Sequence, residues 1–341
     1  MTQQTILVTG ASGFLASHIL LQLLNTGYTV RGSVRNAAKG DHIRKVLETH
    51  GADTTRLEFV ELDLMQDDGW DAAMDGVDHL LHTASPFVTT SPKNAGEITK
   101  PAIEGTCRAL NAALRSNVKR VVLTSSMVAA CHGHAKGRIT PYGESDWTVP
   151  DGKDVTPYIL SKTLAEQEAW KIMEAAGRRD DLTVINPGFI LGPLLESDIG
   201  TSGAIIQRMM QGDFPGTPDI YFSVIDVRDA AELHILAMHD TAVFGRRVFS
   251  AGPSISMQEM AKSLAASFPT FAKKIPTRRL PNLLVRLIAM FDGDVKTAAM
   301  NLGRKHRLDR PLVEPLLGRP LFSTDDAIRE MGQSLIDQKQ V

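Results

Sequence analysis

The sequence has few cysteines, no long apolar run and almost no net charge. Cys107 and Cys131 are its only cysteines, too few for a disulfide framework, which indicates a reducing compartment. A net charge of −2 argues against a nucleic-acid-binding surface over the whole protein. No run of about 18 apolar residues occurs, so we expect no membrane span, and no secretory leader is recognisable. These absences predict a cytoplasmic protein that binds neither nucleic acid nor membrane.

The composition predicts a packed globular protein. Hydrophobic residues make up 43% of the chain and charged residues 22%, which supplies a core and argues against wholesale disorder. A length of 341 residues exceeds a typical single domain, so we expect a main domain with an appendage or one enlarged unit.

A strand, a glycine turn and a helix open the chain. Residues 5–9 are apolar and β-branched, like a buried parallel strand. The sequence GASGFLA follows at 10–16, and then a helical run over 18–25. Gly10 permits a tight turn, and Gly13 lets a pyrophosphate approach the helix N-terminus, where free N–H groups favour anions. This order predicts a dinucleotide-binding unit with the spacing G-x-x-G-x-x-A.

The end of the second predicted strand, residues 29–35, carries cations. Sites that prefer NAD usually place an acid here to bind the ribose 2′-hydroxyl. No acid lies between Gly27 and Gly40, where Arg35 and Lys39 stand instead. Because a guanidinium suits a 2′-phosphate, the sequence favours NADP(H); the alternative is that both are solvated surface charges.

Strands and helices alternate through the first half of the chain. Further strands are predicted over residues 57–62, 77–85 and 120–126, and a long helix over 98–115. This alternation predicts an α/β fold with a Rossmann-type, doubly wound parallel sheet. Ligands of such sheets gather at the carboxyl ends of the strands.

The second half departs from this alternation, because glycines and prolines break residues 186–224 into loops and a short helix. Met209 and Met210 in that helix could fill core or line a pocket. Ser256 and Glu259 have the spacing of a helix capping box. We expect an NADP-binding Rossmann domain of residues 1–184 plus 219–251. A smaller, mostly helical substrate-binding domain would comprise residues 185–218 plus 252–341.

Tyr158 and Lys162 stand four residues apart in a helix predicted over 158–173, so they share one face. An ammonium near a phenol favours phenolate, so we expect Lys162 to lower the pKa of Tyr158 from about 10. Y-x-x-x-K also arises by chance in many helices. Its weight here comes from the dinucleotide unit upstream.

Cys131, His132 and His134 could suggest a metal site. Their spacing fits no zinc signature and lacks a second ligand pair, so we predict a loop near the substrate and no metal. Residues 273–310 hold ten Lys or Arg and three Asp, which fits a solvated face better than an anion site.

Several segments together resemble the extended short-chain dehydrogenase/reductases. Within them, the chain is similar to the branch of dihydroflavonol reductases, cinnamoyl-CoA reductases and yeast-type methylglyoxal/aldehyde carbonyl reductases. The segments that carry the resemblance are VTGASGF (8–14), HTASPF (82–87), KPAIEG (100–105), VVLTSS (121–126), YILSKTLAE (158–166), NPGFILGP (186–193) and IDVRD (225–229).

The resemblance implies a catalytic set of Ser126, Tyr158 and Lys162. Tyr158 would donate a proton to the carbonyl oxygen as hydride arrives from the cofactor. Lys162 would stabilise phenolate and hold the nicotinamide ribose, and Ser126 would orient the carbonyl. Ser125 is adjacent, but the family motif uses the second serine of the pair.

The resemblance also implies contacts to NADP(H) and substrate. The pyrophosphate would lie on Gly10, Ala11, Ser12, Gly13, Phe14 and Leu15, and the 2′-phosphate on Arg35 and Lys39. Asp63 and Leu64 would flank the adenine, Thr83, Ala84 and Ser85 the ribose side, and Pro187, Ile190 and Ser202 the nicotinamide. Phe87, Met127, Cys131 and Phe189 would wall the substrate pocket.

These features predict a reversible NADPH-dependent reductase of an aldehyde or ketone, acting on a small molecule as a monomer or homodimer. A hydroxysteroid or flavonoid-type enzyme of the same family is an alternative, although plant dihydroflavonol reductases carry asparagine where this chain has Cys131. An NAD-dependent nucleotide-sugar epimerase or dehydratase would usually carry the missing acid after the second strand. A non-catalytic NADP-sensing protein would typically lose the Tyr–Lys pair.

Overall fold

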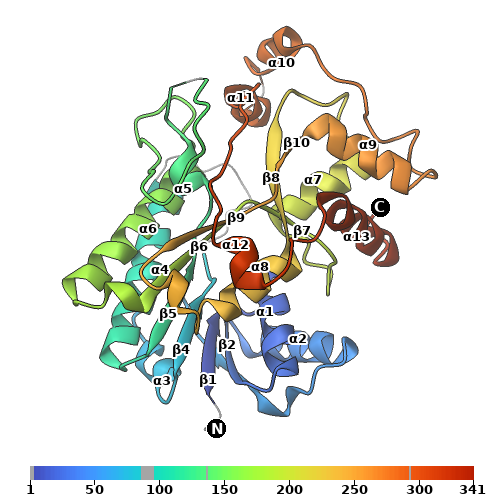
Figure 1. The fold of residues 1–341 in the computed structure, drawn as a ribbon. Helices are drawn as coiled ribbons and strands as arrows, with labels where there is room; N and C mark the ends of the chain where they lie inside the picture. The colour runs from blue at the N-terminus through green and yellow to red at the C-terminus, as the bar shows by residue number, and fades with distance from the viewer. Residues whose placement is uncertain (1–3, 86–95, 136, 292) are drawn as a thin grey trace.

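The computed structural model describes residues 4–85, 96–135, 137–291 and 293–341 (Figure 1). Its central sheet has seven strands in the order β3-β2-β1-β4-β5-β6-β9, each parallel to its neighbours. The strands are β1 (Thr5–Thr9), β2 (Thr29–Val34), β3 (Leu57–Glu61), β4 (His79–His82), β5 (Arg120–Thr124), β6 (Leu182–Pro187) and β9 (Arg247–Ser250). The predicted doubly wound α/β fold is confirmed.

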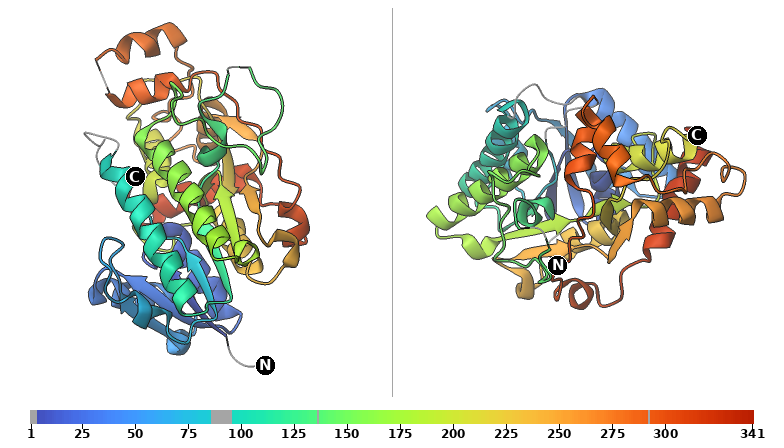
Figure 2. Two further views of the ribbon diagram at one scale, coloured as in Figure 1. Left: turned by 90° about the vertical axis from the view of Figure 1, so that its left-hand side faces the viewer. Right: turned by 90° about the horizontal axis from the view of Figure 1, so that it is seen from above.

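Helices cover both faces of this sheet (Figure 2). One face carries α1 (Phe14–Asn25), α2 (Ala37–Thr49), α8 (Val227–Leu236) and α12 (Val313–Leu317), and the other α3 (Trp70–Met74), α4 (Gly96–Arg115) and α6 (Pro157–Ala175). Successive strand residues point to opposite faces, so Ile6 and Val8 join the first core and Leu7 the second. All three are fully buried, and such a side chain contributes roughly 1.5–3 kcal/mol to the free energy of unfolding.

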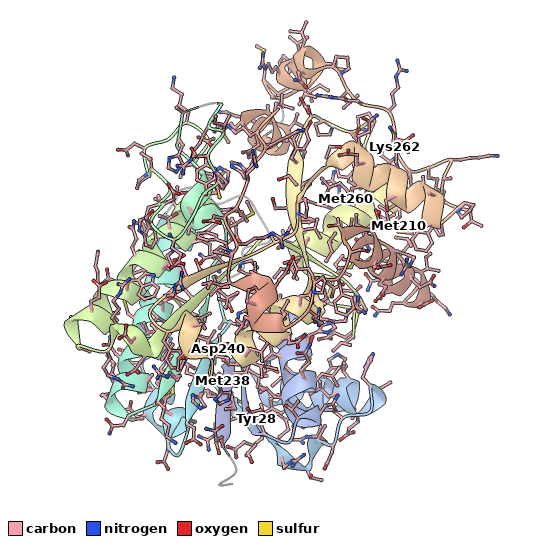
Figure 3. All side chains as sticks on the ribbon, viewed as in Figure 1. Tyr28, Met210, Met238, Asp240, Met260 and Lys262 are labelled. Atoms are coloured by element: carbon pink, nitrogen blue, oxygen red, sulfur yellow. The ribbon has the colours of Figure 1, made fainter. Side chains whose placement is uncertain are left out.

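A second, three-stranded sheet has the order β10-β8-β7. It consists of β7 (Phe189–Leu191), β8 (Tyr221–Asp226) and β10 (Ser254–Ser256), and it packs with α7 (Gly200–Gln211), α9 (Met257–Ser267) and α13 (Thr324–Asp337). Met210 of α7 and Met260 of α9 lie together in its core (Figure 3). Met209 and Met210 therefore fill core, and the capping box of Ser256 and Glu259 is confirmed.

The chain passes between the two sheets more than once. It leaves the large sheet after β6, enters the small sheet at β7, and returns through α8 to β9. Because β8 pairs within the small sheet, residues 219–251 contribute to both sheets. The proposed domain boundaries at 184, 218 and 251 stay a prediction.

The remaining helices lie outside these layers. They are α5 (Val128–Cys131), α10 (Asn282–Ile288) and α11 (Gly293–Met300), the last two packed together at one end of the molecule (Figure 1). Short 3-10 turns occupy Thr54–Arg56, Arg179–Asp181 and Thr241–Val243. In the described part of the chain, no helix combines the length and apolarity needed to cross a membrane.

Candidate active site

An open cleft of about 240 Å³ gathers many of the predicted residues. Its lining comes from the turn after β1, the carboxyl ends of β4, β5 and β6, the start of α6 and the start of β7. The lining residues are Gly10, Gly13, Phe14, Leu15, Ala16, Thr83, Thr124, Ser125, Ser126, Tyr158, Lys162, Pro187, Gly188 and Ile190. The cleft therefore lies at the sheet edge where ligands of open α/β sheets bind.

The glycine turn forms one wall of the cleft. Gly10 has a φ of +67°, and a Cβ there would lie 3.0 Å from the Cα atom of Ala84, on the chain after β4. Gly13 is extended and ends the turn, so α1 begins at Phe14, earlier than the predicted start at residue 18. The first amides of a helix lack intrahelical acceptors, so this wall can bind an anion.

Ala11 and Ser12 complete the turn without lining the cleft. Ala11 is fully buried, and its N–H donates to the carbonyl of Ser33 at 2.8 Å. Ala11 thus holds the turn against β2. Ser12 is half-buried.

The chain after β4 is fixed to β1 by side-chain hydrogen bonds. The hydroxyl of Thr83 donates to the Thr9 carbonyl at 2.5 Å, and the Ala84 N–H donates to the Thr9 hydroxyl at 3.1 Å. His82 shares the same hydroxyl at 2.8 Å, and burial lowers the pKa of His82 to about 3, so its imidazole is neutral. Ala84 and Ser85 border a small cavity behind Lys162.

Tyr158 and Lys162 enter the cleft from the first two turns of α6. Thr156 caps the helix by accepting the Ile159 N–H at 3.3 Å, and Pro157 takes the first helical position. The helix therefore begins immediately before Tyr158. Its one-face geometry places Lys162 in the same cleft as Tyr158.

The expected lowering of the Tyr158 pKa is wrong for this structure. Tyr158 hydrogen-bonds with the Ser126 side chain, which lowers its pKa, but desolvation of the phenol is the larger effect and raises it. The residue lines an open cleft and keeps 50% of its surface exposed. Lys162 is desolvated as well, which lowers its pKa to about 8, against an opposing effect of Glu166.

The two serines at the end of β5 have different partners. The Ser125 hydroxyl donates to Glu166 Oε2 at 2.5 Å, whereas the Ser126 side chain meets Tyr158. This difference supports the choice of Ser126 as the residue that faces a substrate. Asn186 Nδ2 donates to the Ser126 carbonyl at 3.1 Å and to Glu166 Oε2 at 2.7 Å.

Glu166, Asn186 and Arg247 were not among the predicted site residues. Glu166 stands one helical turn after Lys162, so its spacing within YILSKTLAE was the available signal. Arg247 lies 81 residues further along the chain, and its Nε donates to Glu166 Oε1 at 2.5 Å. No local pattern links those two positions.

The predicted adenosine contacts lie beyond the cleft lining. Lys39 borders a groove of about 410 Å³ with Asn36, Ala38, His42, Glu196, Ser197 and Asp198. Arg35 is exposed directly after β2, on the same edge. Asp63 and Leu64 follow β3 at that edge: Asp63 Oδ1 accepts the Met65 N–H at 2.8 Å, and the Leu64 carbonyl accepts from Arg108 at 2.9 Å.

The residues predicted to border the nicotinamide and to wall the substrate pocket divide into two groups. The Ser202 hydroxyl donates to the Ile190 carbonyl at 2.6 Å, which joins α7 to β7. Phe189 packs against Phe222, with ring centroids 4.6 Å apart. Met127 and Cys131, by contrast, belong to a buried cluster with Ala130, Tyr142 and Phe249.

Cys131 has no exposed surface, and burial raises the pKa of its thiol. Because a fully buried thiol cannot contact a substrate in the cleft, Cys131 acts in this structure as core and not as a pocket wall. Phe87, the remaining predicted wall, lies outside the described residues.

The histidines after Cys131 take part in structural contacts. His132 Nδ1 lies 3.2 Å from Asp154 Oδ2, which also accepts from Arg304 Nη1 at 2.9 Å. His134 Nε2 lies 2.8 Å from the Ala130 carbonyl. Among the residues whose placement is described, no group of three His, Cys, Asp or Glu could hold a metal ion.

Comparison with known proteins identifies the lineage. Residues 6–252 match the family model described as the NAD dependent epimerase/dehydratase family. Cinnamoyl-CoA reductase 1 of Petunia hybrida is 36% identical over 279 residues, which cover 81% of this chain and 80% of that protein. Tetraketide alpha-pyrone reductase 1 of Arabidopsis thaliana is also 36% identical over 279 residues, covering 80% and 83%.

The fold has solved counterparts as well. The yeast methylglyoxal/isovaleraldehyde reductase Gre2, crystallised with NADPH, superposes with a TM-score of 0.80 at 24% identity, covering 99% of this chain and 100% of that one. The family match spans most of the chain. The two plant reductases are 36% identical to it over most of their own length, which is enough to establish a common family. The chain therefore belongs to the NAD dependent epimerase/dehydratase family, the extended short-chain dehydrogenase/reductases.

Proposed function

We propose that this protein reduces an aldehyde or ketone to the alcohol with NADPH. The observation that carries the proposal is the convergence of the glycine turn with Ser126, Tyr158 and Lys162 in one cleft. The names of the two plant relatives, both reductases, support the reaction class. The NADPH bound to the yeast reductase supports the cofactor.

The residues fit a dinucleotide. The wall at Gly10 leaves no room for a side chain, and it ends in a helix N-terminus that suits a pyrophosphate. Arg35 and Lys39 follow β2 without an acid between them, which suits a 2′-phosphate. NADPH bound along this edge would supply the hydride.

The side chains of the cleft supply the remaining chemistry. Because burial raises its pKa, Tyr158 is a phenol at neutral pH and can donate a proton to the oxygen that gains charge. Ser126, which hydrogen-bonds with Tyr158, can bind the same oxygen and orient the carbonyl. Lys162, with a pKa of about 8, is mostly cationic at neutral pH and stabilises the phenolate that remains.

The cleft wall at the predicted nicotinamide end is apolar. Pro187, Gly188 and Ile190 line the cleft, and the ring pair of Phe189 and Phe222 packs behind them in the small sheet. We therefore propose that alkyl or aryl carbonyl compounds are preferred over sugar nucleotides. Phe189, Met127 and Phe87 remain the proposed walls, whereas Cys131 packs with Met127 in the core.

A substrate panel tests the proposal. Purified protein is mixed with NADPH or NADH and with aldehydes, α-dicarbonyls, aryl ketones, steroid ketones or a UDP-sugar, and oxidation of the cofactor is followed by absorbance. We expect turnover of at least one carbonyl class with NADPH favoured over NADH. Tight NADPH binding with no oxidation by any carbonyl would contradict the reductase and favour the sensing alternative.

A further inference from the structure

Glu166 is a fully buried carboxylate one helical turn beyond Lys162. Its Oε2 atom accepts hydrogen bonds from Ser125 and Asn186, and its Oε1 atom accepts from Arg247 Nε at 2.5 Å. Burying a charge is costly unless it is paired and fully hydrogen-bonded. An apolar residue would fill this place at lower electrostatic cost, so the charge itself calls for an explanation.

Two carbonyls and an aromatic ring hold Arg247 on the side away from Glu166. Its Nη1 atom donates to the carbonyls of Glu144 and Asp146 at 3.0 and 2.5 Å, and its guanidinium lies 3.9 Å from the centre of the Trp147 ring. Because Arg247 cannot lose its proton in a protein, it supplies the buried Glu166 side chain with a counterion. The Glu166 carboxylate is therefore paired with a cation at Oε1, while its Oε2 atom faces Ser125 and Asn186.

The network contacts the proposed catalytic set at the serine end. Asn186 binds the Glu166 carboxylate and the Ser126 carbonyl with the same amide group. The Ser125 N–H also donates to the Ile185 carbonyl at 2.8 Å. The Ser126 backbone is thus held by the Asn186 amide, which Glu166 orients.

The network acts on Lys162 through charge. Lys162 and Glu166 border a common cavity of about 20 Å³, and the carboxylate raises a pKa that burial lowers to about 8. Among the residues that the structure describes, the other titratable groups beside Lys162 are Tyr158 on the same helix and His82 on β4. Both are neutral at neutral pH, so Glu166 is the charge that offsets the burial of the ammonium.

We propose that Glu166 is a positioning residue of the reductase, which fixes Ser126 through Asn186 and acts on Lys162 across the cavity that the two side chains share. The inference rests on the proposed roles of Tyr158 and Lys162. Glu166 does not touch the reacting atoms in this arrangement. It acts through the two residues that do.

The test is the pH profile of kcat for carbonyl reduction by the whole protein. Glu166→Gln removes the carboxylate at nearly constant shape, so Lys162 should lose its proton at lower pH. The pH above which kcat declines should therefore fall by about one unit. Glu166→Asp keeps the charge and should restore the wild-type value of that pH, even at a reduced kcat. Glu168→Gln is the matched control on α6, because Glu168 bonds Lys171 at the surface at 3.1 Å, and no shift is expected.

Folding is controlled by a second variant. Glu166→Gln leaves Arg247 buried without its counterion, so the protein is also made with Glu166→Gln and Arg247→Gln together, which removes both charges. Since Glu166 is the charge that raises the Lys162 pKa, the same acid shift is expected. Circular dichroism and NADPH titration verify that each variant is folded and binds cofactor.

The outcomes separate this inference from the proposed function. The folded variants could keep the wild-type pH at which kcat declines and lose kcat equally at every pH. That result would show that Glu166 is only structural, and it would overturn this inference without touching the proposed function. A Tyr158→Phe variant with unchanged turnover, or a wild-type protein inactive on every carbonyl, would overturn the proposed function and the inference with it. An acid shift in both Gln variants, absent from Glu168→Gln, supports the inference.

Discussion

At the scale of single residues, the proposed function depends on the protonation of Tyr158. Burial raises its pKa, so at neutral pH the phenol holds the proton that a reduced carbonyl oxygen requires. Tyr158→Phe removes that proton and the hydrogen bond to Ser126. We expect turnover to fall by about 100-fold or more, measured by NADPH oxidation, while fluorescence titration still detects bound NADPH.

Tyr28 offers a control of the same chemistry at a distant site. It lies near the amino end of β1, far from the cleft, and its hydroxyl is 2.9 Å from His239 Nε2 (Figure 3). Tyr28→Phe should leave kcat/KM unchanged. General acid catalysis contributes about 100-fold or more. A Tyr158→Phe variant that keeps more than about a tenth of wild-type turnover would therefore show that Tyr158 is not the proton donor.

Arg35 determines cofactor choice in the proposed function. Its exposed guanidinium follows β2, where a 2′-phosphate would lie. Arg35→Ala should raise KM for NADPH about tenfold, equivalent to roughly 1.4 kcal/mol, and leave KM for NADH unchanged. Lys45→Ala, an exposed cation on α2, is the control. Equal changes with both cofactors would show that Arg35 acts on the fold and not on the phosphate.

At the scale of elements, the turn between β1 and α1 depends on one glycine. Gly10→Ala forces an L side chain into φ +67° and brings its Cβ to 3.0 Å from the Ala84 backbone. Gly76→Ala imposes nearly the same φ, +68°, but in open space. We expect both to lower the free energy of unfolding by about 1–3 kcal/mol in urea. NADPH affinity should fall only for Gly10→Ala. If the Gly10→Ala and Gly76→Ala variants bind NADPH equally well, this turn is not the wall that holds the cofactor.

The elements of the first half could be predicted because their signals are local. β1 is an apolar run bounded by a glycine, and its predicted residues match the structure. The pairing of β8 in the small sheet could not be predicted, since a strand pattern does not specify which sheet receives it. In the site, Tyr158 and Lys162 follow from helical spacing, whereas the partnership of Glu166 with Arg247 joins positions 81 residues apart.

At the scale of the whole molecule, one C-terminal segment joins the small sheet to the loops beside the cleft. The carbonyl of His306 accepts the Ser254 hydroxyl on β10 at 2.8 Å. Next to it, the Arg307 carbonyl accepts the Tyr142 N–H, and the Tyr142 carbonyl accepts the Asp309 N–H, each at 2.8 Å. The segment 304–309 therefore joins the small sheet to the loop that carries Tyr142.

Asp154 holds this connection through buried charge. Asp154 is 2% exposed. Its Oδ2 atom accepts from Arg304 at 2.9 Å and also lies near His132, and its Oδ1 atom accepts the Gly133 N–H at 3.2 Å. Asp154→Asn leaves the Arg304 guanidinium without this counterion, so the free energy of unfolding should fall by about 3 kcal/mol, measured in urea. Asp151→Asn, exposed in the same loop, should change it by less than about 0.5 kcal/mol. Because the segment joins the small sheet to the loop that carries Tyr142, KM for the carbonyl should rise in Asp154→Asn alone; a stable variant with unchanged KM would show that the cleft is organised without this clamp.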